Sequence, residues 1–570
     1  MVLTWRMNMI IGIDLGTTNS LACVYRNGRA ELIPNQLGEN LTPSVVSIDE
    51  RGNMLVGAVA KERLVSYPDQ TAASFKRYMG TDIKVHLGPK SFTPQELSSF
   101  VVRRLKEDAE RYLGEAVTEA VISVPAYFND SQRAATREAG LLAGLRVERI
   151  VNEPSAAALA SSMISGKDEQ CYLVFDFGGG TLDVSVVDYF DKVIEIVAVS
   201  GDNHLGGNDF DQCIAQYFCQ SHQLEFDCLD SAQQATLLRL SERCKKELTQ
   251  KEATFLHFEI DGEDKAVVFN NEILVQCCAN LFDRASIAVK NALRDSGYSS
   301  QEIDEIVVVG GSGKMPVVSY FLETLLGKAP IMLGSPDEIV AQGAGLYAGI
   351  KARNEEIKDV VLTDICPFTL GTNIVNKGNY KRDIMSAIIE RNTTLPASKS
   401  EYYTNVGDNQ KVVKIKIYQG ESVYCDENLY LGEVQLEINA RHAYEASIEV
   451  TFSYDINGIL VVDVLDRKNN NTRQKVLTSK NLRLTQNELE KRIKELQSYK
   501  TNPVGDERNN LLFARGERLY KETTGANRER IMMALQEFGA AVKCGDRQRI
   551  LYMRKNLTEF FDTLEDIYEQ

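Results

Sequence analysis

The chain has 570 residues, of which 44% are hydrophobic and 25% are charged, and its formal net charge is −16. A single core stops growing near ~250–300 residues, so this length predicts two or more domains. No apolar run approaches the ~20 residues that span a bilayer, the negative charge argues against nucleic-acid partners, and the eleven cysteines form no CxxC pair. Because no early segment is apolar enough for a signal peptide, we expect a cytoplasmic protein without membrane insertion.

The first motif is segment 9–20, which reads MIIGIDLGTTNS. An apolar strand is followed by Asp14 and then by a turn that contains one glycine and two threonines. Glycine lets backbone N–H groups approach a ligand closely, so this turn could bind a phosphate. Taken alone, such a turn is more often a tight connection between two strands.

The next elements alternate between helices and a strand. A short helix is expected over 56–64. Thr93 to Glu96 reads Thr-Pro-Gln-Glu, a capping box with an early proline, and it predicts a helix over 93–113. A strand over 120–124 then leads into a helix over 131–142.

Segment 173–187, LVFDFGGGTLDVSVV, repeats the first motif with Asp176 after the strand and three glycines in the turn. The repetition indicates an internal duplication. If the two turns face one another, they can hold a polyphosphate from both sides, with Asp14 and Asp176 reaching its Mg²⁺ ion.

Two further glycine turns follow, at 201–207 before a helix that begins near Asp209, and at 310–314 after the apolar strand 306–309. The second is not a P-loop, because Val308 and Met315 stand where glycine and a hydroxyl residue are required.

An alanine- and glycine-rich helix from Pro336 to about Arg353 should close this part of the chain. Segment 359–364, DVVLTD, is short and apolar between acidic residues, so we expect it to dock in at least one state. It could also be an ordinary last strand of the first domain.

Beyond residue 365 the pattern predicts strands over 412–418, 431–438, 448–454 and 459–465. The last two flank an Asn-Gly turn, a strong hairpin signal, and the set indicates a β-sandwich. From residue 479 the pattern is helical, with a capping box at 485–488 and helices over 528–542, capped by Asn527, and 547–568.

Six segments together resemble the signatures of the seventy-kilodalton heat-shock chaperones, which are DnaK-like members of the actin-like ATPase superfamily. In chain order they read IGIDLGTTNS, VPAYFNDSQRAATREAG, RIVNEPSAAALA, FDFGGGTLDVS, GDNHLGGNDFD and VVVGGSGKMP. The resemblance covers almost the whole chain and extends to a short-lidded type of the family. It implies an α/β actin-like ATPase domain of two duplicated lobes (1–358), a linker (359–364), an all-β peptide-binding sandwich (365–478) and a truncated helical lid (479–570).

The resemblance implies ATP or ADP, Mg²⁺ and K⁺ as cofactors, with Asp14 and Asp176 as the metal-binding residues. Phosphoryl transfer needs mainly positioning and charge stabilisation. The implied catalytic residues are Lys76, Glu153, Asp176, Thr181 and Asp183. From the residues alone, Lys76 could be a solvated surface lysine, Glu153 a helix-start acid and Thr181 a turn residue.

The implied nucleotide-binding residues come from the glycine motifs and from the segment around residue 245. They are Asp14, Gly16, Thr17, Thr18, Asn19, Gly178, Gly179, Gly180, Gly206, Gly207, Glu242, Lys245, Lys246, Thr249, Gly310, Gly311, Ser312, Lys314 and Asp337. Lys314 stands where relatives commonly carry arginine, and because the two side chains stack differently the nucleotide affinity could be altered.

The resemblance also implies protein partners. Unfolded or partly folded clients would contact the sandwich at Thr372, Val375, Tyr403, Val406 and Val413. From the residues alone, the interpretation of these positions as core residues is favoured. Coupling between domains would involve Pro125, Arg133, Leu362 and Asp364, although Thr363 replaces a usual leucine. A J-domain cochaperone would dock on exposed Tyr127, Asn129 and Asp130 together with Arg149, and a nucleotide-exchange factor is a further expected partner.

We therefore expect an ATP-dependent chaperone that binds and releases apolar peptide segments, with ATP hydrolysis stimulated by a J-domain cochaperone. Two alternatives share the superfold. A metabolite kinase would need a small-molecule pocket in the first domain and has no use for the segment after Asp364. A filament-forming ATPase usually ends where the linker begins.

Overall fold

In the computed structural model of the protein, the described residues are 9–165, 169–190, 193–260, 262–352, 361–375, 382–439, 442–455, 458–478, 491, 496, 506–544 and 547–567. The capping box predicted at 485–488 lies outside them.

The first lobe is built on a mixed sheet with the strand order β11-β10-β1-β2-β3. Strand β1 pairs in parallel with β10 and antiparallel with β2. The strands of this sheet are β1 (Met9–Leu15), β2 (Asn19–Arg26), β3 (Arg29–Ile33), β4 (Thr42–Pro43), β10 (Val117–Val124) and β11 (Arg146–Asn152). Around it lie β5 (Val46–Ile48), β6 (Met54–Val56), β7 (Thr71–Ala72), β8 (Val85–Leu87), β9 (Lys90–Phe92), the 3-10 helix η2 (Phe75–Tyr78) and the helices α1 (Ala58–Ser66), α2 (Pro94–Leu113), α3 (Asp130–Leu142) and α4 (Glu153–Ser165).

The second lobe has a sheet with the order β17-β12-β13-β14-β18. Its strands are β12 (Glu169–Phe177), β13 (Leu182–Phe190), β14 (Val193–Asp202), β17 (Glu305–Val309) and β18 (Val361–Thr363). The hairpin β15 (Ala253–Ile260) and β16 (Glu263–Asn270) accompanies it. Its helices are α5 (Gly207–Ser221), α6 (Ser231–Glu247), α7 (Asn271–Cys277), α8 (Ala279–Ser296), the 3-10 helix η4 (Gly311–Lys314) and α9 (Pro316–Leu326). Helix α10 (Ile339–Lys351) follows α9 in the chain but packs on β1 and β2 of the first lobe and on α4.

The two sheets share one strand pattern. Strand β12 pairs in parallel with β17 and antiparallel with β13, as β1 does with β10 and β2. Asp14 and Asp176 therefore occupy equivalent ends of equivalent strands. This shared order supports the internal duplication that the sequence predicts.

The segment after the second lobe forms two packed sheets, ordered β20-β19-β22-β23 and β21-β24-β25-β26. The inward side chains of both sheets form one buried cluster that includes Ile415, Leu436, Phe452 and Val462. The strands are β19 (Leu370–Ile374), β20 (Ile384–Ile389), β21 (Ala397–Tyr403), β22 (Val412–Gln419), β23 (Leu429–Glu437), β24 (Ile448–Tyr454), β25 (Ile459–Asp466) and β26 (Asn471–Thr478). The predicted sandwich is confirmed, because period-two burial on these strands gives each sheet one apolar face.

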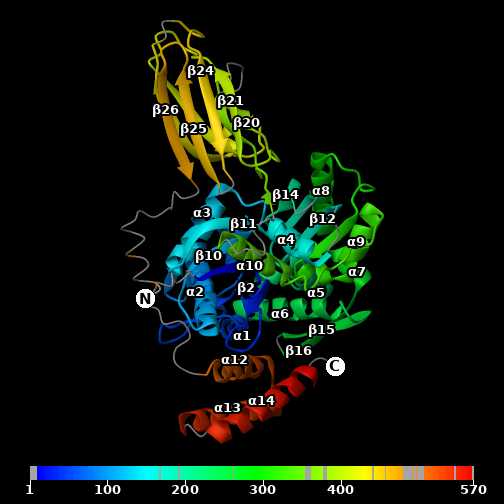
Figure 1. The fold of residues 1–570 in the computed structure, drawn as a ribbon. Coiled ribbons are helices and arrows are strands. Elements are labelled where there is room, and N and C mark those ends of the chain that lie inside the picture. The colour runs from blue at the N-terminus through cyan, green and yellow to red at the C-terminus, as the bar shows by residue number, and fades with distance from the viewer. Residues whose placement is uncertain are drawn as a thin grey trace.

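Three helices complete the described chain: α12 (Glu507–Glu522), α13 (Gly525–Cys544) and α14 (Arg547–Ile567). They pack on one another through Leu512, Ile531, Phe538 and Phe561. Figure 1 shows the sandwich and these helices at opposite ends of the two-lobed body, so the helices lie away from the sandwich.

The predicted elements agree closely with the structure, with one correction. Thr93 and Glu96 form the expected capping box of α2, and the four predicted sandwich strands are β22 to β25. Asn527 is not an N-cap, because α13 already begins at Gly525. The predicted docking of segment 359–364 is confirmed for Val361–Thr363, which extend the sheet beside β14.

Among the described helices, none is long and apolar enough to cross a membrane.

Helix α10 packs so closely on β1 that residue 12 has no room for a side chain, which can be tested at Gly12. A Cβ atom at this position would lie 2.2 Å from the Ala344 carbonyl carbon and 2.2 Å from the Gly345 nitrogen. We predict that Gly12→Ala lowers the free energy of unfolding by about 2–3 kcal/mol, because the clashing atoms belong to the backbone of α10 and cannot move aside without distorting the helix. Urea unfolding without nucleotide measures the effect. Gly178→Ala is the control, since its Cβ would meet only the Thr181 carbonyl oxygen at 3.7 Å, and equal stability of the two variants would contradict the prediction.

Candidate active site

The two glycine and threonine turns face one another between the lobes. A Cβ atom on Gly179 would lie 1.8 Å from Thr18 Oγ1, and one on Gly180 would lie 2.5 Å from Thr17 Cγ2. The turns can approach so closely only because these positions are glycine. Thr18 Oγ1 is buried and, among the residues that the structure describes, has no hydrogen-bond partner, so a polar atom is available to a ligand there.

A cavity of about 390 Å³ opens at this meeting point. It is lined by residues from both turns, from the end of α6, from the turn after β17 and from the start of α10. The lining residues predicted from the sequence are Asp14, Gly16, Thr17, Thr18, Asn19, Lys76, Glu153, Asp176, Gly178, Gly179, Thr181, Glu242, Lys245, Lys246, Thr249, Gly310, Gly311, Ser312, Lys314 and Asp337.

Four predicted residues do not line the cavity and instead support its wall. A Cβ on Gly206 would lie 2.4 Å from the Gly180 nitrogen, so Gly206 lets the second turn pack on α5. Gly207 accepts a hydrogen bond from Lys245 Nζ at 2.9 Å. Gly180 accepts one from Arg77, and Asp183 lies behind the wall beside Asp176.

The cavity floor holds several buried carboxyl groups and one lysine. Lys76 Nζ lies 2.8 Å from Glu153 Oε1, and both side chains are almost fully buried, at 4% and 9% exposure. The alternative that Lys76 is a solvated surface lysine is therefore wrong. An ion pair that is desolvated in this way holds its lysine in one position, facing the same space as Asp14 and Asp176.

Burial changes the protonation of the remaining carboxyl groups. Burial first, and next the negative charge of Glu153, raises the pKa of Asp14 to about 7 and that of Asp183 to about 7. The same two causes raise the pKa of Asp176 well above its usual range. Ser123 Oγ donates to Asp14 Oδ1 at 2.8 Å and favours the charged form. These carboxyl groups lack enough protein cations to stabilise their charges, so the cavity favours a positively charged ligand beside them.

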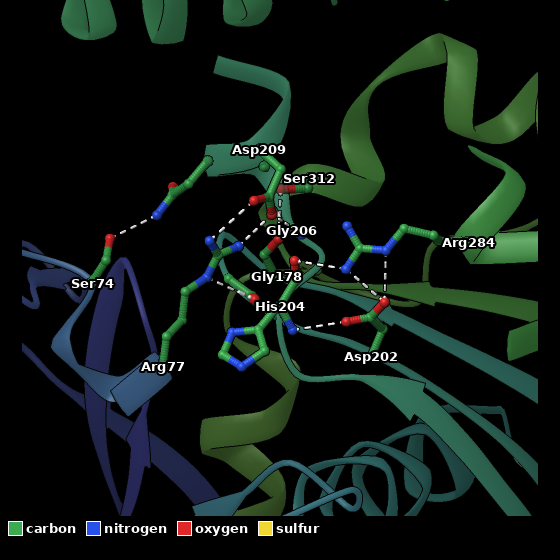
Figure 2. A network of polar contacts seen from close by, with 12 residues as sticks. Ser74, Arg77, Gly178, Asp202, His204, Gly206, Asp209, Arg284 and Ser312 are labelled. Carbon is green, nitrogen blue, oxygen red and sulfur yellow. Dashed lines mark hydrogen bonds and ion pairs between the residues drawn. The ribbon is translucent and has the colours of Figure 1, made fainter. Parts of the chain in front are cut away.

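A polar network joins the lobes beside the second turn, as Figure 2 shows. Arg77 donates to the Gly180 carbonyl oxygen at 2.9 Å and forms an ion pair with Asp209. Asn208 Nδ2 donates to Ser74 Oγ at 2.8 Å. Sequence reasoning missed Arg77 and Asn208, although Arg77 is adjacent to the predicted Lys76.

The other missed residues are apolar and also line the cavity. They are Leu21, Leu41, Met315, Pro336 and Val340. Met315 and Pro336 flank predicted residues and could have been inferred. Leu41 has no sequence signal, because only the folding of its loop brings it to the cavity.

A chain of contacts leads from Asp183 to the sandwich. The Tyr127 backbone N–H donates to Asp183 Oδ1 at 3.1 Å, and the Tyr127 ring packs on Phe368 with centroids 4.6 Å apart. Next to it, Tyr454 Oη donates to Asp130 Oδ1 at 3.2 Å, and the Asp130 N–H donates to Gln419 Oε1 at 3.0 Å.

These contacts correct one prediction about the surface. Asp130 is buried under the sandwich and is not exposed, whereas Tyr127 and Asn129 are half-buried. Arg149 is also half-buried, with its guanidinium 5.0 Å from the centre of the Tyr347 ring. The expectation of an exposed docking surface that includes Asp130 is therefore wrong for this arrangement of domains.

The predicted coupling residues lie at the same junction. Pro125 is buried, and Arg133 donates to Asn152 Oδ1 at 2.5 Å. The Asn152 amide in turn donates to Asp364 Oδ2 at 2.7 Å. Leu362 pairs through its backbone with Ile194, so the junction connects α3, β11 and the segment that leads into the sandwich.

The predicted peptide-contact residues fall into two groups. Thr372 is fully buried and donates to the Lys416 carbonyl oxygen at 2.9 Å, and Val413 belongs to the sandwich core. Val375 and Val406 are exposed by 50% and 39%, while Tyr403 is half-buried and donates to Ser386 Oγ at 3.0 Å. Only the second group is accessible on the sandwich surface.

The sequence of the chain matches known proteins over most of its length. The model of the Hsp70 protein family matches residues 10–86 and 81–537. The chaperone protein DnaK of Thermotoga neapolitana is 40% identical over 508 residues, which cover 87% of this chain and 84% of the relative. The chaperone proteins DnaK of Thermotoga petrophila and Thermotoga maritima are each 39% identical with the same coverage.

The buried Lys76 gives a direct test of the site. We predict that Lys76→Met lowers nucleotide hydrolysis by about 10²–10³-fold, because it removes the cation that is held beside the carboxyl groups by Glu153. Single-turnover hydrolysis measures this loss separately from binding. Lys84→Met, at an exposed lysine of the neighbouring loop, is the matched control and should hydrolyse at the wild-type rate. Unchanged hydrolysis in Lys76→Met would remove the residue from the mechanism.

Proposed function

The chain belongs to the Hsp70 family and is an ATP-dependent chaperone with ATPase activity, and from this premise we propose how its parts divide the work. ATP binds in the cavity between the lobes, and the sandwich binds unfolded client segments. Contacts where the sandwich meets the two-lobed domain couple the nucleotide site to the client site. The observation that carries this proposal is the unbroken path from Asp183 through Tyr127 to Phe368, because it links the carboxyl cluster to the sandwich.

The two opposed turns suit the phosphates of the nucleotide. Backbone N–H groups and threonine hydroxyls are the donors that phosphate oxygens require, and the glycines leave room for them. The end of α6, the turn after β17 and Pro336 then enclose the nucleoside. Lys314 forms an ion pair with Asp337 at this edge, so part of its charge is already compensated before a nucleotide binds.

The residues also fit a magnesium ion. Asp14 and Asp176 both line the cavity, and Mg²⁺ is usually held by one or two carboxylates together with phosphate oxygens and several waters. Asp14 and Asp176 would hold it, and K⁺ would be a further ion near Asp183. Bound Mg²⁺ would supply charge that neutralises the phosphates and the buried carboxyl groups.

For hydrolysis, the protein's own groups need only position the attacking water and stabilise charge on the terminal phosphate. Glu153 fixes Lys76, whose ammonium group lies where it can orient a water and stabilise charge on the terminal phosphate. Thr181 lines the phosphate end of the cavity. Asp183, behind the wall beside Asp176, has a raised pKa and is suited to hold a proton next to the site.

We assign residues 1–358 to the nucleotide-binding domain, 359–364 to the linker, 365–478 to the peptide-binding sandwich and 479–570 to the lid. Val375, Val406 and Tyr403 are the proposed client contacts, with Thr372 and Val413 supporting them from the core. Family membership supports a J-domain cochaperone, a nucleotide-exchange factor and a cytoplasmic location as further parts of the proposal.

The test is ATP turnover by the full chain with and without a short extended apolar peptide. Acceleration by the peptide is expected, because a ligand that favours one domain arrangement must shift the equilibrium at the other site. Turnover that is indifferent to every peptide would contradict coupling. No turnover at all would favour the kinase alternative, and sedimentation with ATP would indicate a filament.

The docking of the sandwich should depend on the Tyr454 hydroxyl. We predict that Tyr454→Phe reduces the docked population, because the buried Asp130 carboxyl loses a donor whose absence costs about 1–3 kcal/mol. Energy transfer between dyes on the sandwich and on the first lobe, with ATP bound, measures the docked fraction.

Tyr430→Phe is the control for this measurement, since Tyr430 lies on the same sandwich and is 50% exposed. Equal docked fractions for the two variants would show that the Tyr454 bond does not hold the domains together.

A further inference from the structure

Helix α12 is anchored on α1 of the first lobe. Ala514 packs into an apolar cluster with Val59 and Ala60. Arg518 forms an ion pair with Glu62, and Lys521 Nζ donates to the Ser66 carbonyl oxygen. Because apolar packing and charge act together over one face, α12 belongs with the first lobe in this arrangement.

The last residue of α12 also reaches the second lobe. Glu522 Oε1 lies 2.5 Å from a guanidinium nitrogen of Arg239 on α6, and Arg518 lies 2.8 Å from the other Glu522 oxygen. The Arg239 side chain is 28% exposed and that of Glu522 is 12% exposed. The pair is thus shielded from water, where an ion pair resists separation more than it does on an open surface.

Helix α6 is itself a wall of the nucleotide cavity. Glu242, one turn beyond Arg239, lines the cavity and accepts from Lys246 Nζ at 2.7 Å. Lys61 Nζ of α1 lies 3.3 Å from the same carboxylate, across the boundary between the lobes. The consecutive residues Lys61 and Glu62 therefore contact the second lobe and α12, respectively.

We propose that α12 acts as a clamp across the two lobes and that Glu522 and Arg239 are positioning residues that slow nucleotide release. The nucleoside end of the cavity can widen only if α6 moves away from α1. With α12 fixed on α1, this movement must break the Glu522–Arg239 pair in addition to the Lys61–Glu242 pair. Docking of the lid thereby raises the barrier to release. The inference rests on the proposed binding of nucleotide in this cavity.

The test is the rate at which the full chain releases a fluorescent, non-hydrolysable ATP analogue during a chase with unlabelled ATP. We expect Glu522→Gln and Arg239→Gln each to release it about fivefold to tenfold faster, because either change removes one charge of the shielded pair. The double variant should be no faster than the faster single variant, since both changes remove one interaction. Glu559→Gln is the matched control, because Glu559 is an exposed residue of α14 and its pair with Lys555 is loose, at 3.9 Å.

The outcomes separate this inference from the function on which it rests. Release at the wild-type rate by either single variant, or additive effects in the double variant, would overturn the clamp while leaving nucleotide binding intact. Failure of the wild-type chain to bind the analogue would instead contradict the proposed nucleotide site. Faster release by Glu559→Gln would show a general loosening of the lid and would also overturn the specific role of Glu522.

Discussion

The burial of several carboxyl groups around one lysine is the constraint on which the rest of the structure depends. Asp176 and Asp183 are buried and Asp14 is half-buried beside two turns that only glycine allows to meet, and Lys76 is already paired with Glu153. The groups cannot all carry charge unless a cation lies between the lobes. The relative position of the lobes is therefore tied to the ligand between them, which makes the cleft a natural place for control by nucleotide.

The same constraint explains how the site can influence distant elements. The Tyr127 backbone N–H donates a hydrogen bond to Asp183, and the Tyr127 ring packs against Phe368 of the sandwich. At the other end of the body, α12 spans α1 and α6 through Arg518, Glu522 and Arg239. The sandwich and α12 each contact elements that also line or support the cavity. A change in the geometry of the cleft must therefore act on both the sandwich and the lid. Coupling of this kind is reciprocal, since each site biases the same two arrangements.

Much of this architecture could be predicted from local sequence. The turns at 16–19 and 178–181, the capping box of α2 and the strands of the sandwich depend on neighbours in the chain, and the structure places them as expected. What could not be predicted depends on contacts between distant segments. Asp130 has the sequence context of an exposed helix start, yet Tyr454 and Gln419 cover it. Leu41, Arg77 and the position of α12 likewise follow from docking and from loop folding, which leave no periodic pattern in the sequence.

The central claim is that nucleotide and client sites share one conformational equilibrium. The most direct measurement is the affinity of a labelled extended apolar peptide, by fluorescence anisotropy, with ADP and then with ATP on the full chain. The account predicts weaker binding and faster release with ATP, because we assign to the ATP-bound state the arrangement of Figure 1, in which the sandwich is docked and the lid lies far from it. Identical peptide affinity and release in the two nucleotide states would contradict it.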